Sequence, residues 1–266
     1  MEEANITESR NQYIAKSNTL IQRSRYSLTL QQQRILLFLI SKIKPTDTAD
    51  QEYTFRIGEF CKVCGITAST GDYYATVKDD LLYIRNNGFW LKLEDGRLTT
   101  VSWLNKAYIK SDEDGAEITV KFDKEMMPYL FQLQRYYTQY KLKNVLSYQG
   151  KYSIRLYEII RSYYTQRDIE RMNDKEIVFS AQEIRELLLI KPIYPAWTDF
   201  EKRVIKPAVK EINLYCDEFE VTYQTKKVAH RVSMITFIIN PAHHSLRKAK
   251  RREDKLNRIP NHSPVD

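Results

Sequence analysis

The 266-residue chain has a net charge of +8 at pH 7 and an isoelectric point near 9.2, which favours an anionic partner such as nucleic acid. Its 42% hydrophobic and 29% charged residues are typical of a globular protein and exclude a largely disordered one. No apolar run approaches the ~18 residues of a membrane span, and the opening MEEANITESR does not resemble a secretory signal. We therefore expect a cytoplasmic protein without membrane contact.

The first part of the chain alternates helices and strands. Residues 1–28 are polar with isolated apolar positions, and we expect an N-terminal arm with a short helix over Tyr13–Leu20. A buried helix follows from Thr29 and stops at Pro45, because proline cannot continue a helix. The next predicted elements are a strand over Tyr53–Phe55, a helix over Ile57–Cys64 ended by Gly65, a helix over Thr70–Asn86, and three strands in FWLKL, LTTVSWLNKAYIK and EITVKF.

A second unit is predicted from Val145 onward. Its strands EFEVTYQT and HRVSMITFII alternate apolar and polar residues and are expected to form a hairpin. The elements before that hairpin are a helix over Tyr152–Thr165, a strand over Glu176–Phe179, a helix over Ala181–Leu189 and a helix over Thr198–Cys216.

The two units are similar in sequence. Glu52–Ile66 aligns without a gap with Glu176–Ile190, at a constant offset of 124, and the apolar positions agree. Each unit has the order helix, strand, helix, turn, helix, hairpin, which is the order of a winged helix-turn-helix. Because the order of elements is shared as well, we interpret the match as an internal duplication. The predicted fold is α+β, with two tandem winged helix-turn-helix domains.

The helix over Thr198–Cys216 is the strongest candidate for a functional surface. Thr198 and Glu201 have the spacing of a capping box, and Pro207 predicts a kink. Its apolar side is formed by Phe200, Val204, Ile205, Ala208, Val209 and Ile212, and its other side carries Lys202, Arg203, Lys206 and Lys210. An ordinary solvated surface helix has the same pattern, so the helix-turn-helix setting decides the interpretation.

In a helix-turn-helix, the second helix enters the major groove with its N-terminal residues at the base edges. We therefore predict DNA contacts from Thr198, Asp199, Lys202, Arg203, Lys206 and Lys210. Arg203 suits guanine, Asp199 suits the amine of cytosine, and Lys206 and Lys210 suit phosphates. The wing would add contacts from Lys226, Lys227, His230 and Arg231.

The equivalent helix of the first unit is acidic. Lys78 and Arg85 are its cations, and they are outnumbered by Asp72, Asp79 and Asp80. We expect Lys78 and Arg85 to make auxiliary phosphate contacts, with the remaining surface available to protein partners.

A catalytic site is not indicated. The four histidines, His230, His243, His244 and His262, do not form the His-hydrophobe-His metal site of DNA-nicking initiators, and no P-loop is present. Cys61 and Cys64 spell C-x-x-C, but a zinc site needs two further ligands at similar spacing, so we interpret both as buried core residues. We predict a protein that is not an enzyme and uses no cofactor or metal.

Three separated segments carry a resemblance to a known family. They are NQYIAKSNTLIQRSRYSLTLQQQRILLFLISKI, YTQYKLKNVLSYQGKYSIRLYEIIRSY and FEKRVIKPAVKEIN. In this order they resemble the Rep_3 family of plasmid replication initiators, over roughly residues 11–240. The resemblance implies a bacterial protein with two winged-helix domains, of which the second reads repeated origin sequences (iterons). It also implies a monomer that initiates, a homodimer joined through the first domain that represses, and a host initiator and replicative helicase as partners.

These inferences divide the chain into four parts. We expect an arm at 1–28, a first winged-helix domain at 29–144 for dimerisation and auxiliary DNA contact, and a second at 145–246 as the main DNA reader. Residues 247–266, in which cations outnumber anions, are expected to be a basic disordered tail. The alternative is a winged-helix transcription repressor without initiator activity, because repression would use the same binding surface.

Overall fold

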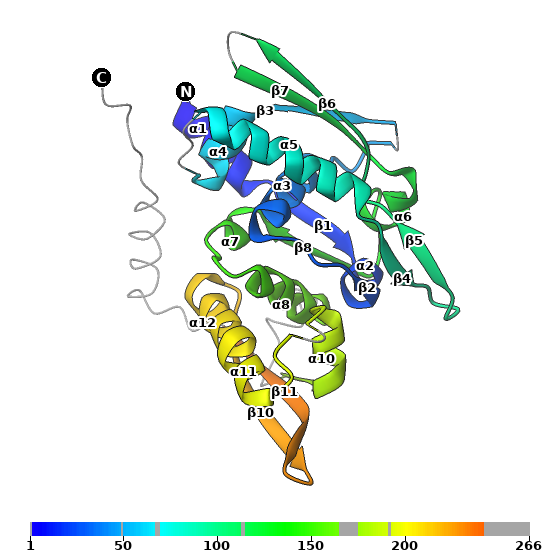
Figure 1. Ribbon diagram of the computed structural model, residues 1–266, viewed down its shortest axis with the longest axis vertical. Coiled ribbons are helices and arrows are strands. Elements are labelled where there is room, and N and C mark those ends of the chain that lie inside the picture. Colours follow the sequence, from blue (N-terminus) through cyan, green and yellow to red (C-terminus); the bar gives the residue numbers. More distant parts are fainter. Residues whose placement is uncertain are drawn as a thin grey trace.

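The computed structural model describes residues 2–48, 50–66, 70–112, 115–164, 175–190 and 193–241. Two units lie at opposite ends of the molecule, with helix α8 (Lys151–Ser162) between them (Figure 1). The expected tail at 247–266 falls outside the described residues.

The first unit contains the elements before α8. In chain order they are α1 (Glu2–Asn11), β1 (Tyr13–Ser17), α2 (Asn18–Arg23), β2 (Ser24–Arg25), α3 (Leu30–Ser41), β3 (Glu52–Arg56), α4 (Ile57–Cys64), α5 (Thr70–Asn86), β4 (Phe89–Lys92), β5 (Leu98–Val101), β6 (Leu104–Asp112), β7 (Gly115–Phe122), a 3-10 turn (Lys124–Met126), α6 (Met127–Leu130), β8 (Tyr137–Lys141) and α7 (Lys143–Leu146). Gly65 ends α4 in the left-handed conformation, at φ 64°, as its position in the sequence predicts.

The second unit follows α8. Its elements are β9 (Lys175–Ser180), α10 (Ala181–Leu187), α11 (Trp197–Phe200), a π-helical turn (Glu201–Ile205), α12 (Lys206–Tyr215), β10 (Phe219–Val228) and β11 (Arg231–Pro241). The hairpin β10–β11 projects from the end of the molecule that lies farthest from the first unit (Figure 1).

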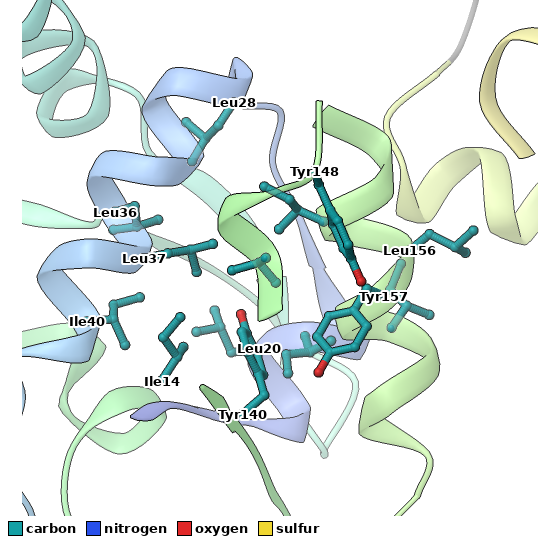
Figure 2. Close-up of a cluster of buried hydrophobic side chains, with 14 of the residues drawn as sticks. Ile14, Leu20, Leu28, Leu36, Leu37, Ile40, Tyr140, Tyr148, Leu156 and Tyr157 are labelled. Carbon is teal, nitrogen blue, oxygen red and sulfur yellow. The ribbon is translucent and has the colours of Figure 1, made fainter. Parts of the chain in front are cut away.

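The N-terminal segment is folded into the first unit, so the expected arm is wrong for residues 2–28. β1 pairs with β8 in an antiparallel sheet, and the expected helix over Tyr13–Leu20 is this strand followed by α2. Ile14, Leu20 and Ile21 are completely buried. Figure 2 shows Ile14 and Leu20 in one cluster with side chains from α3, β8 and α8. These isolated apolar positions are therefore core residues, although the polar residues around them conceal this in the sequence.

The expected strand LTTVSWLNKAYIK is two strands in different sheets. β5 pairs with β4, and β6 pairs with β7. The chain turns between them at Trp103, whose buried ring packs against Tyr26 and Phe89, with ring centroids at 5.1 and 4.9 Å. Burial of this large ring anchors the chain at the point where it passes from one sheet to the other.

The duplication is visible in the strand pairing. The sheet order is β3-β7-β6 in the first unit and β9-β11-β10 in the second, so the first strand pairs with the last strand of the hairpin in both. Phe55 faces Ile118, and its counterpart Phe179 faces Ile235. The β4–β5 hairpin of the first unit is inserted between α5 and the hairpin β6–β7. The predicted class, α+β with two tandem winged-helix domains, is confirmed.

Helix α8 joins the two units. Every residue from Ser153 to Ser162 is buried, because the helix packs against α2 and β8 on one side and α12 on the other. The expected domain boundary at Val145 thus precedes a helix that contributes to both cores.

Candidate nucleic-acid interface

The expected helix over Thr198–Cys216 is continuous from 197 to 215 and is called the recognition helix below. The apolar side is buried as predicted, at Phe200, Val204, Ile205, Ala208, Val209 and Ile212. The prediction of a capping box is wrong. The N-cap is Ala196, which makes no side-chain cap hydrogen bond, and Thr198 lies inside the first turn. The turn before the recognition helix is therefore stabilised by a side chain from another element, Arg185.

Pro207 is accommodated by the π-helical turn just before it. The backbone N–H of Lys206 bonds to the carbonyl of Glu201, one residue farther back than in an α-helix. Pro207 then occupies the first turn of α12, where its missing N–H costs least. The irregularity expected from the proline is therefore a local widening of the helix.

The recognition helix presents its cations to solvent. All twelve residues predicted to contact DNA are exposed: Thr198, Asp199, Lys202, Arg203, Lys206, Lys210, Lys226, Lys227, His230, Arg231, Lys78 and Arg85. Lys202 and Lys210 make no ion pair with any other residue that the structure describes. The Lys206 ammonium lies 3.7 Å from the carboxylate of Glu201, which is also on the recognition helix. This exposed row of positive charge is suited to phosphates.

Arg185 of α10 holds the turn that precedes the recognition helix. Its guanidinium donates to the carbonyls of Tyr194 at 2.5 Å, Ala196 at 3.3 Å and Pro195 at 3.5 Å. It also lies 4.2 Å from the Phe200 ring centroid. Burial lowers the pKa of Arg185, but arginine stays charged in proteins. A basic residue of α10 thus stabilises the helix-turn-helix instead of facing a ligand.

Two side chains fasten the recognition helix to the wing. Asn213 donates to the carbonyl of Val221 at 2.8 Å and accepts from its N–H at 2.7 Å, which satisfies both backbone groups on the free edge of β10. The hydroxyl of Tyr223 donates to Glu201 at 2.8 Å, and the pKa of Tyr223 is raised by burial and by this carboxylate. Helix and wing therefore form one rigid surface.

The four predicted wing residues are divided between the turn of the hairpin and the strands next to it. The turn is formed by Ala229 and His230, both with positive φ (47° and 65°), whereas Lys226 and Lys227 lie before it on β10. The strand register shifts between these two lysines, which breaks the regular alternation there. The four predicted wing residues nevertheless all lie in the exposed outer part of the hairpin.

Glu211 orients the recognition helix on α8. Its carboxylate accepts from the backbone N–H of Gln149 at 3.1 Å and of Gly150 at 3.1 Å. Gly150 is the N-cap of α8, so a carboxylate at this helix N-terminus is favoured by the helix dipole. No local sequence pattern predicts this contact, because it joins residues that are far apart in the chain.

The equivalent helix of the first unit, α5, is used differently. Asp80 accepts from Gln31 at 2.7 Å and from Gln32 at 2.8 Å, at the start of α3. Arg85 donates to the side chain of Asn86 at 2.9 Å. Asp80, one of the acidic residues of α5, is therefore used in packing against α3.

The structure bears on the other functional classes within its described residues. They contain no group of three or more His, Cys, Asp or Glu side chains placed to hold a metal ion. Cys61 and Cys64 are buried, as predicted, and burial raises the pKa of Cys61 to about 11. None of the described helices combines the length and the apolar character needed to cross a membrane.

Comparison with known proteins identifies the family. Residues 13–161 match the model of the first winged-helix domain of initiator replication proteins, and residues 180–239 match that of the second. The chain belongs to the Rep_3 family of replication initiators. The WH1 and WH2 domains of this family are thus the first and second units described above.

Two similar proteins illustrate the relationship. A replication initiation protein of Escherichia coli is 26% identical over 196 residues, which cover 72% of this chain and 59% of that protein. The match thus spans less than two thirds of the relative's length. The fold is shared with a Pi initiator protein crystallised with iteron DNA, at a TM-score of 0.67 and 20% identity, covering 88% of this chain and 99% of the other.

Proposed function

We propose that this Rep_3 protein binds repeated double-stranded DNA sequences at a plasmid origin and thereby initiates replication. The observation that carries the proposal is the recognition helix, which buries one side in the WH2 core and exposes Lys202, Arg203, Lys206 and Lys210 on the other. The E. coli relative is named as a replication initiation protein, and the Pi initiator protein was crystallised with iteron DNA. Both names support initiation over operator-binding repression.

We further propose a division of contacts within WH2. Thr198, Asp199 and Arg203 lie on the N-terminal half of the recognition helix, from which a helix-turn-helix reads base edges. Lys206 and Lys210 follow on α12, where they suit phosphates. Lys226, Lys227, His230 and Arg231 extend the contact along the wing, and Lys202 completes the positive surface.

WH1 is proposed as the dimerisation domain with auxiliary DNA contacts from Lys78 and Arg85. Both side chains are exposed on α5, but the helix carries too little positive charge to bind DNA alone. A homodimer would repress, and a monomer would recruit the host initiator and helicase. No cofactor is required by these roles.

A replication assay tests the proposal. A small plasmid carrying the coding region and its flanking DNA, with no other origin, is expected to replicate. A frameshift early in the coding region should abolish replication, and the intact protein supplied in trans should restore it. Replication that continues after the frameshift, with increased transcription from the flanking DNA, would contradict initiation and support a repressor.

A binding assay tests the repeat requirement. The protein is expected to shift flanking DNA that contains direct repeats about two helical turns apart. Equal affinity for the same DNA with its repeats scrambled would contradict sequence-specific binding.

A further inference from the structure

We infer that Tyr194 is a specificity-determining residue that positions Arg203 for the base it reads; the inference rests on the proposed DNA-binding function. The Arg203 guanidinium carbon lies 5.6 Å from the centroid of the Tyr194 ring. Cations within about 6 Å of an aromatic face are attracted by the negative charge of that face. The ring therefore restricts an otherwise free, exposed arginine to one side of the helix.

The backbone around Tyr194 is fixed before DNA arrives. Tyr194 has a left-handed backbone, at φ 57°, which is unfavourable for a residue with a bulky side chain. Arg185 compensates by donating to the Tyr194 carbonyl at 2.5 Å and to two of the next carbonyls of the turn. Arg185 is itself placed against the Phe200 ring. A chain of contacts thus runs from the WH2 core through Arg185 to Tyr194 and then to Arg203.

Ordering of the arginine matters for specificity more than for affinity. A long side chain that must be ordered on binding loses rotamer entropy, and only a defined guanidinium position gives the paired hydrogen bonds that select guanine. Phosphate contacts tolerate a mobile cation, because they depend mainly on charge. Loss of the Tyr194 ring should therefore weaken discrimination at one base pair and leave non-specific binding unchanged.

The test compares full-length variants on DNA selected from a randomised duplex pool by the native protein. Tyr194→Leu removes the aromatic face but keeps apolar bulk, whereas Tyr194→Phe keeps the face. Binding is measured for the selected duplex, each single base-pair variant of it and an unrelated duplex. Tyr194→Leu is expected to reduce discrimination at a single position by about two- to fivefold, and Tyr194→Phe to match the native protein.

The arginine link is tested in the Arg203→Ala background. There Tyr194→Leu is expected to have no further effect at that position, because the side chain that it orients is absent. Tyr13→Leu is the control with the same substitution, since Tyr13 in WH1 is exposed and has the Lys141 ammonium 5.8 Å from its ring centroid. It should leave discrimination unchanged.

Three results would overturn the inference. The first is that Tyr194→Leu discriminates between base pairs as well as the native protein does. The second is that Tyr194→Leu loses affinity equally for all duplexes. The third is that Tyr194→Leu causes the same loss of discrimination in the native and Arg203→Ala backgrounds. If the native protein shows no base preference on any duplex, the proposed function itself is contradicted. If the native protein prefers one base and Tyr194→Leu keeps that preference, only the role of Tyr194 is contradicted and the proposed function stands.

Discussion

A buried ionic cluster links the N-terminal segment of WH1 to α8. The Lys16 ammonium lies 2.7 Å from Glu158, and both side chains are almost completely buried. Tyr140 donates to the same carboxylate, and Arg155 lies 3.9 Å from its second oxygen while donating to the carbonyl of Ile21 at 2.7 Å. Such a cluster contributes little net stability when intact, but each charge depends on its partner.

Glu158→Leu is therefore expected to lower the free energy of unfolding by about 3–5 kcal/mol, because it leaves the Lys16 ammonium buried and unpaired. Urea denaturation measures the change. The double variant Lys16→Met/Glu158→Leu should recover much of the loss. Lys121→Met, which breaks an exposed ion pair with Asp50, should have no measurable effect. An unchanged free energy of unfolding in Glu158→Leu would contradict the dependence of the Lys16 ammonium on this carboxylate.

The Cys61 thiol should make stability depend on pH in the alkaline range. Its pKa rises on folding from 9.0 to about 11 because burial disfavours the thiolate. The folded chain thus retains a proton that the unfolded chain loses, so the stabilisation is complete below pH 9 and falls as pH rises towards 11. Thermal unfolding should show the native protein losing stability relative to Cys61→Ala across this range. A constant difference between the two proteins would contradict this.

The wing turn is strained at Ala229, a residue type that does not indicate a positive φ in the sequence. Ala229 has φ 47°, a conformation that costs an L-residue about 1–2 kcal/mol. Ala229→Gly is expected to raise the free energy of unfolding by about 1 kcal/mol, as measured by urea denaturation. Ala107→Gly, an exposed strand position in the WH1 hairpin, should lower it by roughly 0.5–1 kcal/mol. Destabilisation by both variants would indicate that the Ala229 turn is not strained.

Elements with strong local signals could be predicted from the sequence. The helix that ends at Gly65, the amphipathic recognition helix and the alternating hairpin strands all follow from short-range patterns. Around Trp103, the alternation of apolar and polar residues predicts extended strands but does not indicate the sheet to which each strand belongs. The sequence therefore predicts one strand where the structure has β5 and β6. The exposed lysines of the candidate site could be found in the same way. The roles of Arg185, Glu211 and Asn213 depend on backbone groups that are distant in sequence or on turns without a motif.

Helix α8 packs against both WH1 and WH2. It contributes Glu158 and Arg155 to the WH1 side, and the backbone N–H of its N-cap, Gly150, donates to the carboxylate of Glu211 in the recognition helix. The position of the recognition helix relative to WH1 is therefore set by this helix. We propose that α8 belongs to both domains.

Truncation tests the role of α8. A fragment of residues 1–164 is expected to unfold cooperatively in urea, whereas residues 1–144, which lack α8 and the Glu158 partner of Lys16, should be markedly less stable. Because α5 carries little positive charge, both fragments should bind DNA poorly in a gel shift. Equal stability of the two fragments would show that WH1 does not need α8.

We propose that the recognition helix reads DNA through Arg203. The most direct measurement is the affinity of native protein and Arg203→Ala for the selected duplex and for its single base-pair variants, with Lys78→Ala in WH1 as the control. Arg203→Ala is expected to cost ~1–3 kcal/mol on the selected duplex, or about 5- to 150-fold in Kd, and to relax preference at one base pair. Lys78→Ala should weaken all duplexes slightly and equally. Unchanged affinity and preference in Arg203→Ala would contradict the claim.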